Sequence, residues 1–520
     1  MKKIGKLKLV ALLLTVLMTL GVLVGCSSKT AVDPDSEVIL AGARDLAPGE
    51  KDAYYTSSIL KIWEPLVGVN DAGEPIPVLA KEWMHSDDYK VWTFKLVENV
   101  KFHDGTTFNA DVVVKNFDRY TSMKTKSSPF YTFDVSKIYP NLEKVEAGGE
   151  NEVKLSFTEP FSTLIYSMTN FGSAMFSPEC FDKTTGDFTG IVQGTGPFKL
   201  MAHEKDQYAV LQRNEEYYGE KAGAKNIRVK VIPSAETRYS ALKSEEIMGV
   251  LDLGSLTPAL TNELLKDEKY AVSTADSTIN HYIHTNGTKA PFNDPKMKKA
   301  LSLLIDREKI VNDFFYGYAT PTVNFLNQVS PFYKEEKQDV DVEQAKKLAN
   351  EVLQGQTAEV SFIIPQYGID RYPYKEIVEY LQSELKQIGL NASITILDGA
   401  AYKAAQKAGN YDLAIGTQGL PNFEPAMLFK NYMGSNGSTN KAYCLGYNNE
   451  KVDALLKTLD VTQDMAERGK IYDALQDIAV SDPATTPIFG DVNLGVYNKK
   501  LDHYNAAIYG ITLDQVKWAK

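Results

Sequence analysis

One segment in the second half of the sequence changes between the two hydrophobic periods that distinguish strands from helices. Residues 360–364 form an apolar run of strand length. Apolar residues then recur at helical spacing up to Gly389, a residue typical of helix ends: Ile377, Val378, Leu381, Leu385 and Ile388. Ile394 and Ile396 begin a second strand, and residues 411–415 are expected to continue the sheet. A strand, a helix and a strand in this order predict a parallel sheet with a right-handed crossover, and therefore an α/β fold.

Alternating apolar residues predict a half-exposed hairpin early in the chain. Trp92, Phe94 and Leu96 alternate with their neighbours, and Val100 resumes the alternation after a turn at residues 98–99. We therefore expect the two halves of this segment to pair across the turn.

A helix is expected directly after this hairpin. Asn109 is a favourable N-cap residue, and Asp104-Gly105 supplies a turn just before it. The predicted inner face of the helix consists of Val112, Val113, Asn116, Phe117 and Tyr120.

The first 25 residues predict an export signal that is removed by cleavage. Four lysines at positions 2, 3, 6 and 8 form a basic head, and residues 9–24 form an apolar core. A membrane-spanning helix needs about 20 consecutive apolar residues. This core is shorter and is diluted by Thr15, Thr19 and Gly21.

The end of that signal, Leu23-Val24-Gly25-Cys26, resembles the lipobox of bacterial lipoproteins. In a lipobox the peptidase cuts before the cysteine, and the cysteine sulfur carries a diacylglycerol. The resemblance implies that Cys26 is the lipidated mature N-terminus, with fatty acids such as palmitate holding the protein at the outer face of the cytoplasmic membrane. An ordinary secretory signal with an incidental cysteine is the alternative. Residues 26–37 are expected to form a flexible linker.

Charge, size and cysteine content limit the remaining possibilities. The chain has 67 Asp and Glu against 56 Lys and Arg, which argues against a nucleic acid partner. Its 520 residues, 43% of them hydrophobic, predict more than one core and at least two lobes. Beyond Cys26, only Cys180 and Cys444 remain, and they lack metal-ligand spacing. The two could pair, but we expect two unrelated thiols and no metal cluster.

No group of residues predicts catalysis. His281 and His284 lie in an extended segment, where a separation of three directs two side chains to opposite faces of a sheet. Residues 194–198 (Gly-Thr-Gly-Pro-Phe) lack the Lys-Ser/Thr pair of a phosphate loop, and Pro197 has no N–H donor. The chain is therefore not expected to be an enzyme or to carry a cofactor.

Several blocks in a fixed order resemble the peptide- and nickel-binding family of ABC importer solute-binding proteins. They extend over essentially the whole mature chain and comprise Trp63-Glu64-Pro65-Leu66, residues 75–83 (PIPVLAKEW), Ser86-Asp87-Asp88, residues 92–96 (WTFKL), residues 100–105 (VKFHDG), residues 194–198 (GTGPF), residues 213–220 (RNEEYYGE), Ala300-Leu301-Ser302 and Ile305-Asp306-Arg307.

The resemblance implies a two-lobed periplasmic-binding-protein-like α/β fold with an extra subdomain and a hinge between the lobes. Residues 38–253 and 492–520 would form lobe I with the inserted subdomain, and residues 254–491 would form lobe II. The protein would be a monomer that delivers its ligand to the transmembrane permease subunits of the importer. Sequential, independent domains are the alternative.

The resemblance also places the ligand between the lobes. Segments that line the cleft in this family contribute eight candidate ligand-binding residues: Tyr54, Tyr55, Phe130, Tyr131, Phe171, Gln418, Asn422 and Phe423. Aromatic side chains offer a large contact area at modest entropic loss.

The nature of the ligand follows from a missing residue. Family members that bind free peptides usually carry an Asp for the peptide ammonium in the loop matched by residues 416–425, and this chain has none there. Glu424 and Asp398 are the nearby carboxylates that could replace it. Several blocks most resemble the sequences of the nickel-binding branch, whose members bind nickel complexed with a small organic chelator. The arginine that binds the chelator in that branch is absent near residues 171–174 of this chain. A nickel chelate is the first prediction and a short peptide is the alternative.

Overall fold

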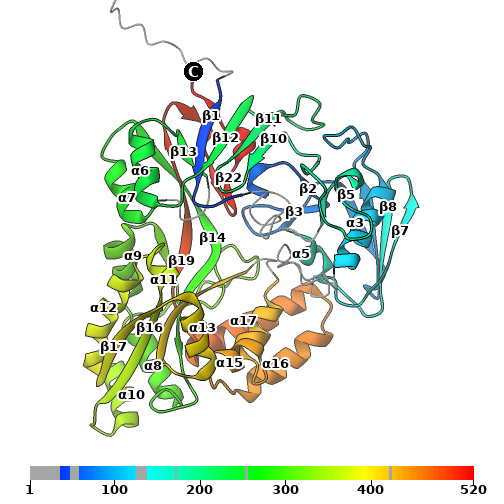
Figure 1. The fold of residues 1–520 in the computed structure, drawn as a ribbon. Coiled ribbons are helices and arrows are strands. Elements are labelled where there is room, and N and C mark those ends of the chain that lie inside the picture. The colour runs from blue at the N-terminus through cyan, green and yellow to red at the C-terminus, as the bar shows by residue number, and fades with distance from the viewer. Residues whose placement is uncertain (1–35, 47–57, 124–137, 170–172, 252–255, 421–423) are drawn as a thin grey trace, which may run out of the picture.

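Residues 36–46, 58–123, 138–169, 173–251, 256–420 and 424–520 are described by the computed structural model. An eleven-stranded sheet runs through the molecule (Figure 1). Its strand order is β10 (Phe198–Glu204), β11 (Tyr208–Arg213), β12 (Asn226–Val231), β1 (Val38–Gly42), β13 (Gly249–Val250), β19 (Thr486–Asn498), β14 (Tyr270–Thr285), β18 (Leu413–Gly419), β16 (Ala358–Pro365) and β17 (Leu390–Leu397), with β15 (Ala319–Pro321) paired to β19.

Two long antiparallel strands, β14 and β19, connect the two halves of this sheet. They pair at one end through Tyr270 and Asn498 and at the other end through Ile283 and Thr486. Between these ends the register shifts, and residues 277–279 have no partner in the β14–β19 ladder. Figure 1 shows both strands passing from the upper half of the molecule to the lower half. The fold is therefore two-lobed, with β14 and β19 crossing between the lobes, and the stretch where their register shifts is called the hinge below.

The lower half contains the predicted α/β unit. Strands β16 and β17 are parallel, with Ala358 opposite Leu390, and β18 is parallel to β16. The helix between them, α12 (Tyr374–Leu385), continues as a 3₁₀ turn and ends at Gly389, whose φ is 76°. All five residues of its predicted inner face are buried. The prediction for this segment is confirmed.

The predicted hairpin at residues 98–99 is wrong. Strand β6 (Val91–Leu96) buries Trp92, Phe94 and Leu96 as expected, but it pairs with β5 (Ala80–His85) and β8 (Glu152–Phe157). Residues 100–108 instead close on themselves, since Phe108 N donates to Val100 O at 2.9 Å. Alternation reports which face of a strand is buried and carries no information about its neighbour.

The predicted helix after this segment is confirmed as α3 (Ala110–Met123). Val112 N donates to Asn109 Oδ1 at 3.1 Å, so Asn109 is the N-cap. The predicted inner face is buried throughout. Helix α3 covers the sheet β5-β6-β8-β7, in which β7 is Leu142–Gly149, and together they form the extra subdomain at one side of the upper half (Figure 1).

Helices surround the lower half. They are α8 (Pro295–Leu304), α9 (Arg307–Phe315), α10 (Val342–Leu353), α11 (Gln366–Ile369), α13 (Gly399–Ala408), α14 (Ala426–Met433), α15 (Ser438–Ala442), α16 (Glu450–Val461) and α17 (Met465–Ser481). The upper half adds α5 (Leu164–Met168), α6 (Ala235–Lys243) and α7 (Pro258–Leu264). Short strands complete it: β2 (Glu64–Pro65), β3 (Val67–Val69), β4 (Pro75–Pro77), β9 (Ala174–Met175), β20 (Leu501–Asp502), β21 (Ala506–Ala507), β22 (Gly510–Ile511) and β23 (Lys517–Trp518).

Two further features concern the length of the described helices and the state of the two cysteines in the body of the chain. Among the described helices, none has both the length and the apolar character that a membrane-spanning helix requires. Cys180 and Cys444 are free thiols, as predicted.

Candidate ligand-binding site

Gln418 is the one predicted ligand-binding residue within the described part of the chain. It lies at the carboxyl end of β18, directly opposite Asn280 of the hinge strand β14. Its Oε1 accepts a hydrogen bond from the Tyr432 hydroxyl at 3.1 Å, and its Nε2 donates to Gly419 O at 2.8 Å. The half-buried amide is thus held in a fixed orientation beside the hinge. The other predicted residues, Tyr54, Tyr55, Phe130, Tyr131, Phe171, Asn422 and Phe423, lie outside the described residues, as does Cys26.

A buried ion pair follows shortly after this strand. Glu424 Oε1 accepts from Arg468 Nη2 at 2.6 Å and from the Tyr472 hydroxyl. The Glu424 and Arg468 side chains are 9% and 8% exposed. Arg468 also donates through Nη1 to the carbonyls of Leu459 and Thr462, both at 2.9 Å. Glu424 therefore ties the loop after β18 to helices α16 and α17.

The pKa values of the partners reflect this environment. Burial, followed by the Glu424 charge, raises the pKa of Tyr472 well above its usual range, so the phenol remains a hydrogen-bond donor. Burial is the largest influence on Arg468 and lowers its pKa, but the charges of Glu424 and Tyr472 and the hydrogen bonds to them together outweigh it, so the pKa is raised. Glu424 thus contacts both a guanidinium group and a phenol that stays protonated.

The two halves of the molecule contact each other in front of this ion pair. Ser162 N, from the extra subdomain, donates to Gln463 Oε1 at 3.3 Å. The Tyr166 ring of α5 lies 5.6 Å from Phe332, whose ring lies 5.0 Å from Tyr472. A groove of about 420 Å³ separates residues 140–163 from Lys430, Leu459, Asp460, Gln463 and Arg468. Among the described residues, the lobes thus meet at the hinge, at this contact and where Val329 packs against Ile508.

The second carboxylate candidate for a ligand ammonium, Asp398, is an N-cap. Its Oδ1 accepts from Ala400 N and Ala401 N at the start of α13, each at 2.9 Å. Both carboxylates that the sequence offered for an ammonium group are therefore already bound within the protein.

The histidine pair behaves as predicted. His281 stacks on Phe489 at 4.1 Å and bonds Tyr374, whereas His284 bonds Thr485 and packs near Tyr443. The two side chains thus lie on opposite faces of β14. Burial lowers the pKa of His284 to about 3 and that of His281 well below its usual value, so both rings are neutral. Within the described residues, no group of three or more His, Cys, Asp or Glu side chains is arranged to hold a metal.

A different buried carboxylate, Glu64, joins three of the sequence blocks. Its Oε2 accepts from Thr195 Oγ1 at 2.8 Å, and its Oε1 accepts from the hydroxyls of Tyr217 at 2.6 Å and Tyr218 at 3.1 Å. Burial raises the pKa of Glu64, against the opposing effect of these donors and of nearby Lys61. Thr195 can approach Glu64 because the glycines on either side of it pack closely against the backbone of the segment that carries Glu64. A Cβ atom on Gly194 would lie only 2.2 Å from Ile62 O.

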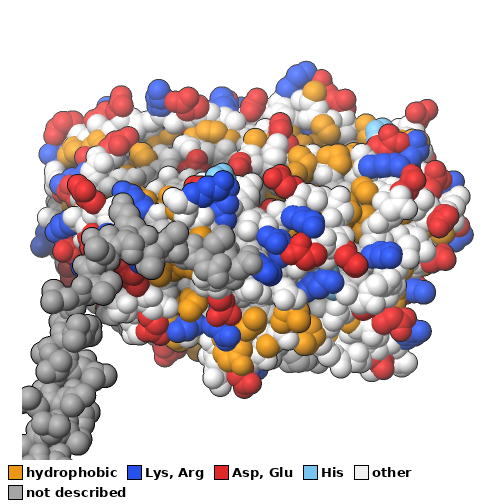
Figure 2. Space-filling view, turned by 90° about the horizontal axis from the view of Figure 1, so that it is seen from above, with side chains coloured by type: hydrophobic (Ala, Val, Ile, Leu, Met, Phe, Trp, Pro, Cys, Tyr) orange, Lys and Arg blue, Asp and Glu red, His pale blue; other side chains and the backbone are white. Residues whose placement is uncertain are grey.

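The surface shows no basic stripe on the face drawn in Figure 2, where acidic and basic side chains are interspersed with small apolar areas.

A two-lobed α/β chain with a two-stranded hinge and a polar contact between the lobes has the architecture of an extracellular solute-binding protein of an ABC importer. Residues 74–440 match the model of the bacterial extracellular solute-binding proteins, family 5. The chain belongs to this family, whose members bind solutes for transport and partner with permease subunits; it is not an enzyme.

Relatives with known names bind different solutes. The chain is 27% identical over 449 residues to the probable D,D-dipeptide-binding periplasmic protein DdpA of Escherichia coli, covering 84% of this chain and 83% of the relative. It is 25% identical over 502 residues to the glutathione-binding protein GsiB of Escherichia coli, covering 93% and 94%. The structure of NikA from Brucella suis in complex with Fe(III)-EDTA superimposes with a TM-score of 0.80 at 20% identity, covering 93% of this chain and 100% of that chain.

Some site residues could not be found from the sequence. Arg468, Tyr472 and Gln463 belong to none of the recognised blocks, and the Ser162–Gln463 contact joins positions 301 residues apart. The Glu424 carboxylate was noted, but nothing local in the sequence indicated its cationic partner.

Proposed function

We propose that this solute-binding protein captures a small metal chelate, with nickel as the metal, between its two lobes and delivers it to the permease. The observation that supports this ligand is the engagement of Glu424 by Arg468 and Tyr472. A peptide ammonium buried without a carboxylate partner costs several kcal/mol. Because Glu424 and Asp398 are both occupied, a ligand without a free ammonium suits the described residues better.

The test is to purify the protein from its native host and to analyse the bound material by native mass spectrometry with metal analysis. A stoichiometric chelator carrying nickel is the expected result. A metal-free mixture of short peptides would overturn the proposal.

A short peptide is the second candidate, and the sequence relatives favour it. DdpA and GsiB carry the names of a dipeptide binder and a glutathione binder. A peptide-binding version of this chain would need an ammonium partner other than Glu424 and Asp398. Isothermal titration with a dipeptide, its N-acetylated form and nickel-loaded histidine distinguishes the two candidates, because only a peptide site responds to loss of the ammonium.

The proposed ligand contacts are the eight residues named above. Gln418 is supported by its place at the carboxyl end of β18, where it adjoins the hinge. Alanine at Tyr131, Phe171 and Phe423 together should abolish binding of the co-purified ligand in a folded protein, whereas alanine at the exposed Tyr316 should not. Unchanged affinity in the triple variant would place the site elsewhere.

We also propose that Cys26 is lipidated and anchors the protein outside the cytoplasmic membrane. The basic head, the apolar core and the Leu-Val-Gly-Cys sequence support it. Replacing Cys26 by Ser should release the protein from the membrane fraction, and retention of the variant there would count against lipidation.

The division into lobe I (38–253 with 492–520) and lobe II (254–491) is likewise proposed. It is supported by the packing of residues 501–516 into the same core as residues 38–251. A lobe that needs both chain ends cannot survive as one contiguous fragment. Limited proteolysis should therefore give no stable folded fragment that ends near residue 253.

A further inference from the structure

A small polar cavity lies at the hinge, where β14 and β19 lose their register. Its volume is about 10 Å³, close to that of a single water-sized guest. Asp276 and Asn280 line it from the two sides of the register shift, Gly490 and Asp491 line it from β19, and Thr320 and Asn327 complete it from β15 and the connection that follows.

Two buried amide oxygens in this cavity have no hydrogen-bond donor among the described residues: Asn280 Oδ1 and Asn327 Oδ1. The two side chains are 1% and 5% exposed. The Asn327 amide is oriented by its Nδ2, which donates to Thr278 O at 2.5 Å, and Asn280 Nδ2 makes a longer contact of 3.5 Å with Asn324 O. Exchanging the oxygen and nitrogen of either amide would lose that bond. Both oxygens are therefore available to accept a hydrogen bond or to ligate a cation.

The rest of the cavity wall is also rich in oxygen. The Thr320 hydroxyl donates to Asp276 Oδ1 at 3.2 Å, and the Tyr372 hydroxyl donates to Asp491 Oδ2 at 3.0 Å. Carboxylate, amide and hydroxyl oxygens suit hard cations and water. Asp276 is exposed, so a path to solvent begins beside the cavity.

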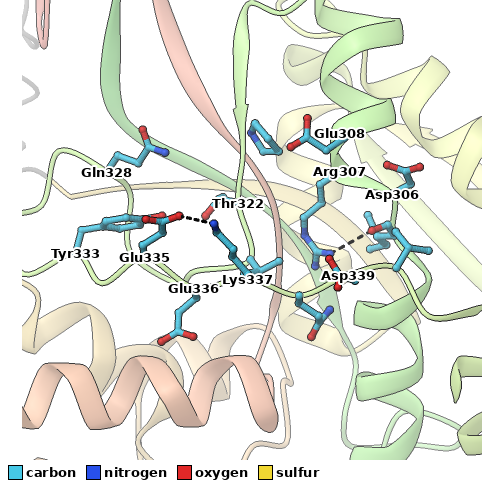
Figure 3. Close-up of a pocket in the computed structure, with 15 residues that line it drawn as sticks. Asp306, Arg307, Glu308, Thr322, Gln328, Tyr333, Glu335, Glu336, Lys337 and Asp339 are labelled. Carbon is cyan, nitrogen blue, oxygen red and sulfur yellow. Dashed lines mark hydrogen bonds and ion pairs between the residues drawn. The ribbon is translucent and has the colours of Figure 1, made fainter.

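An acidic groove of about 570 Å³ adjoins this cavity and shares Thr322 and Gln328 with it. Figure 3 shows acidic side chains at both ends of the groove. They are Asp306, Glu308, Glu335, Glu336 and Asp339. The two cationic residues of the groove are engaged: Arg307 binds the carbonyls of Ser302, Ile305 and Pro487, and Lys337 pairs with Glu335 at 3.2 Å. Such a groove raises the local concentration of cations.

We propose that the hinge cavity binds one electropositive guest of single-atom size between Asn280 and Asn327, either a sodium-sized cation or a water molecule. The guest ties the hinge strand β14 to the connection after β15. Since Asp276 and Asn280 lie on opposite sides of the register shift, lobe closure changes the distances around the guest. Guest binding and closure are then linked, and each changes the equilibrium of the other by the same factor.

A high-resolution crystal structure of the mature chain is the direct test. One crystal is grown in sodium chloride and a second is soaked in thallium(I). A cation should lie about 2.3–2.6 Å from both amide oxygens, as hard cations do, and should be replaced by thallium with an anomalous peak. A water should lie about 2.5–3.0 Å away, most often near 2.7–2.8 Å, and give no anomalous peak. A cavity with no density within reach of either oxygen overturns the proposal.

Solution measurements separate the two guests. If the guest is a cation, the unfolding midpoint of the mature chain should be higher in sodium chloride than in choline chloride at equal ionic strength. The difference between the two salts should be larger in Asn327→Asp, which adds a charged oxygen, and absent in Asn327→Leu, which removes the oxygen. For a water, the two salts should act alike in every variant. Thr274→Val, at an exposed position of β14, is the control and should match the unsubstituted chain. If Asn327→Leu does not fold, Gly490→Ala replaces it, because its Cβ would lie 3.2 Å from Asn280 Oδ1.

Discussion

Each half of the molecule buries a glutamate side chain, and the two side chains have different hydrogen-bond partners. In the upper half, Glu64 is held by three hydroxyl groups, from Thr195, Tyr217 and Tyr218, and burial raises its pKa. In the lower half, Glu424 is held by the Arg468 guanidinium and one hydroxyl.

The difference shows two roles for the same residue type. Hydroxyl donors can satisfy a carboxylate in either protonation state, so the Glu64 group fastens three chain segments without a fixed charge. An ion pair has no neutral alternative, because removing one partner leaves a buried charge. The Glu424 pair therefore joins the start of α14 to α17 through a buried charged contact, whereas the Glu64 group joins its segments through hydroxyl groups alone.

The largest effect is expected from Arg468→Met. The substitution leaves Glu424 buried without its cation, which costs about 3–5 kcal/mol of stability. Urea denaturation of the mature chain measures it. The double variant Arg468→Met with Glu424→Leu should recover a large part of the loss, since no charge is then buried. A loss below about 1 kcal/mol in the single variant would show that Glu424 finds another partner or water.

Tyr217→Phe should have the next largest effect, with a loss of about 1–3 kcal/mol, the range for a hydrogen bond to a charged or buried acceptor. Tyr217 makes the shortest of the three bonds to Glu64, at 2.6 Å. Tyr218→Phe removes the longer bond of 3.1 Å and is the matched control, with a smaller expected loss. Equal losses in the two variants would mean that ring packing, rather than the hydroxyl, dominates.

The sequence predicted those parts of this comparison that depend on local patterns. The α/β unit around α12 was found because hydrophobic period and a terminal glycine at residue 389 are read from neighbouring residues. The opposite placement of His281 and His284 followed from strand geometry alone. The hairpin at residues 98–99 failed because strand pairing is decided by distant segments, here residues 80–85 and 152–157.

Both glutamate networks depend on contacts that no local pattern encodes. The family resemblance marked the blocks around Glu64, Thr195 and Tyr217, but not that they meet at one carboxylate 131 and 153 residues apart. Arg468 lies outside every block, so the sequence did not indicate that Glu424 pairs with Arg468. Of the predicted ligand residues, Gln418 lies beside the hinge and seven lie outside the described residues, and all eight stay predictions.

A pH-dependent effect separates the two glutamates further. Folding raises the pKa of Glu64, so the folded protein holds this proton more tightly than the unfolded chain does. The associated stability is fully present below the ordinary glutamate pKa of about 4.3 and is lost as pH rises through the raised value. Glu64→Gln lacks this titration.

The stability advantage of the unsubstituted chain over Glu64→Gln should therefore fall as pH rises from about 4.3. Glu82→Gln is the control, because the exposed Glu82 pairs with Lys95 and that contact lowers its pKa. The stability advantage of the unsubstituted chain over Glu82→Gln should change in the opposite sense and decrease as pH falls. A flat profile for Glu64→Gln would indicate that the unfolded and folded states hold this proton equally.

The smallest effect is expected from Lys430→Met, which removes a second ion pair from the same region of the lower half. Lys430 pairs with Asp460 at the groove between the lobes, but the two side chains are 33% and 53% exposed. Exposed pairs contribute about 0.2–1 kcal/mol, because water and salt screen the charges and holding two long side chains loses entropy. The loss should shrink further in 1 M sodium chloride, where the Debye length is about 3 Å. The loss in Arg468→Met should persist there, since that pair is shielded from the solvent. If both variants responded equally to salt, burial would not be what distinguishes the Glu424 pair from the exposed Lys430 pair.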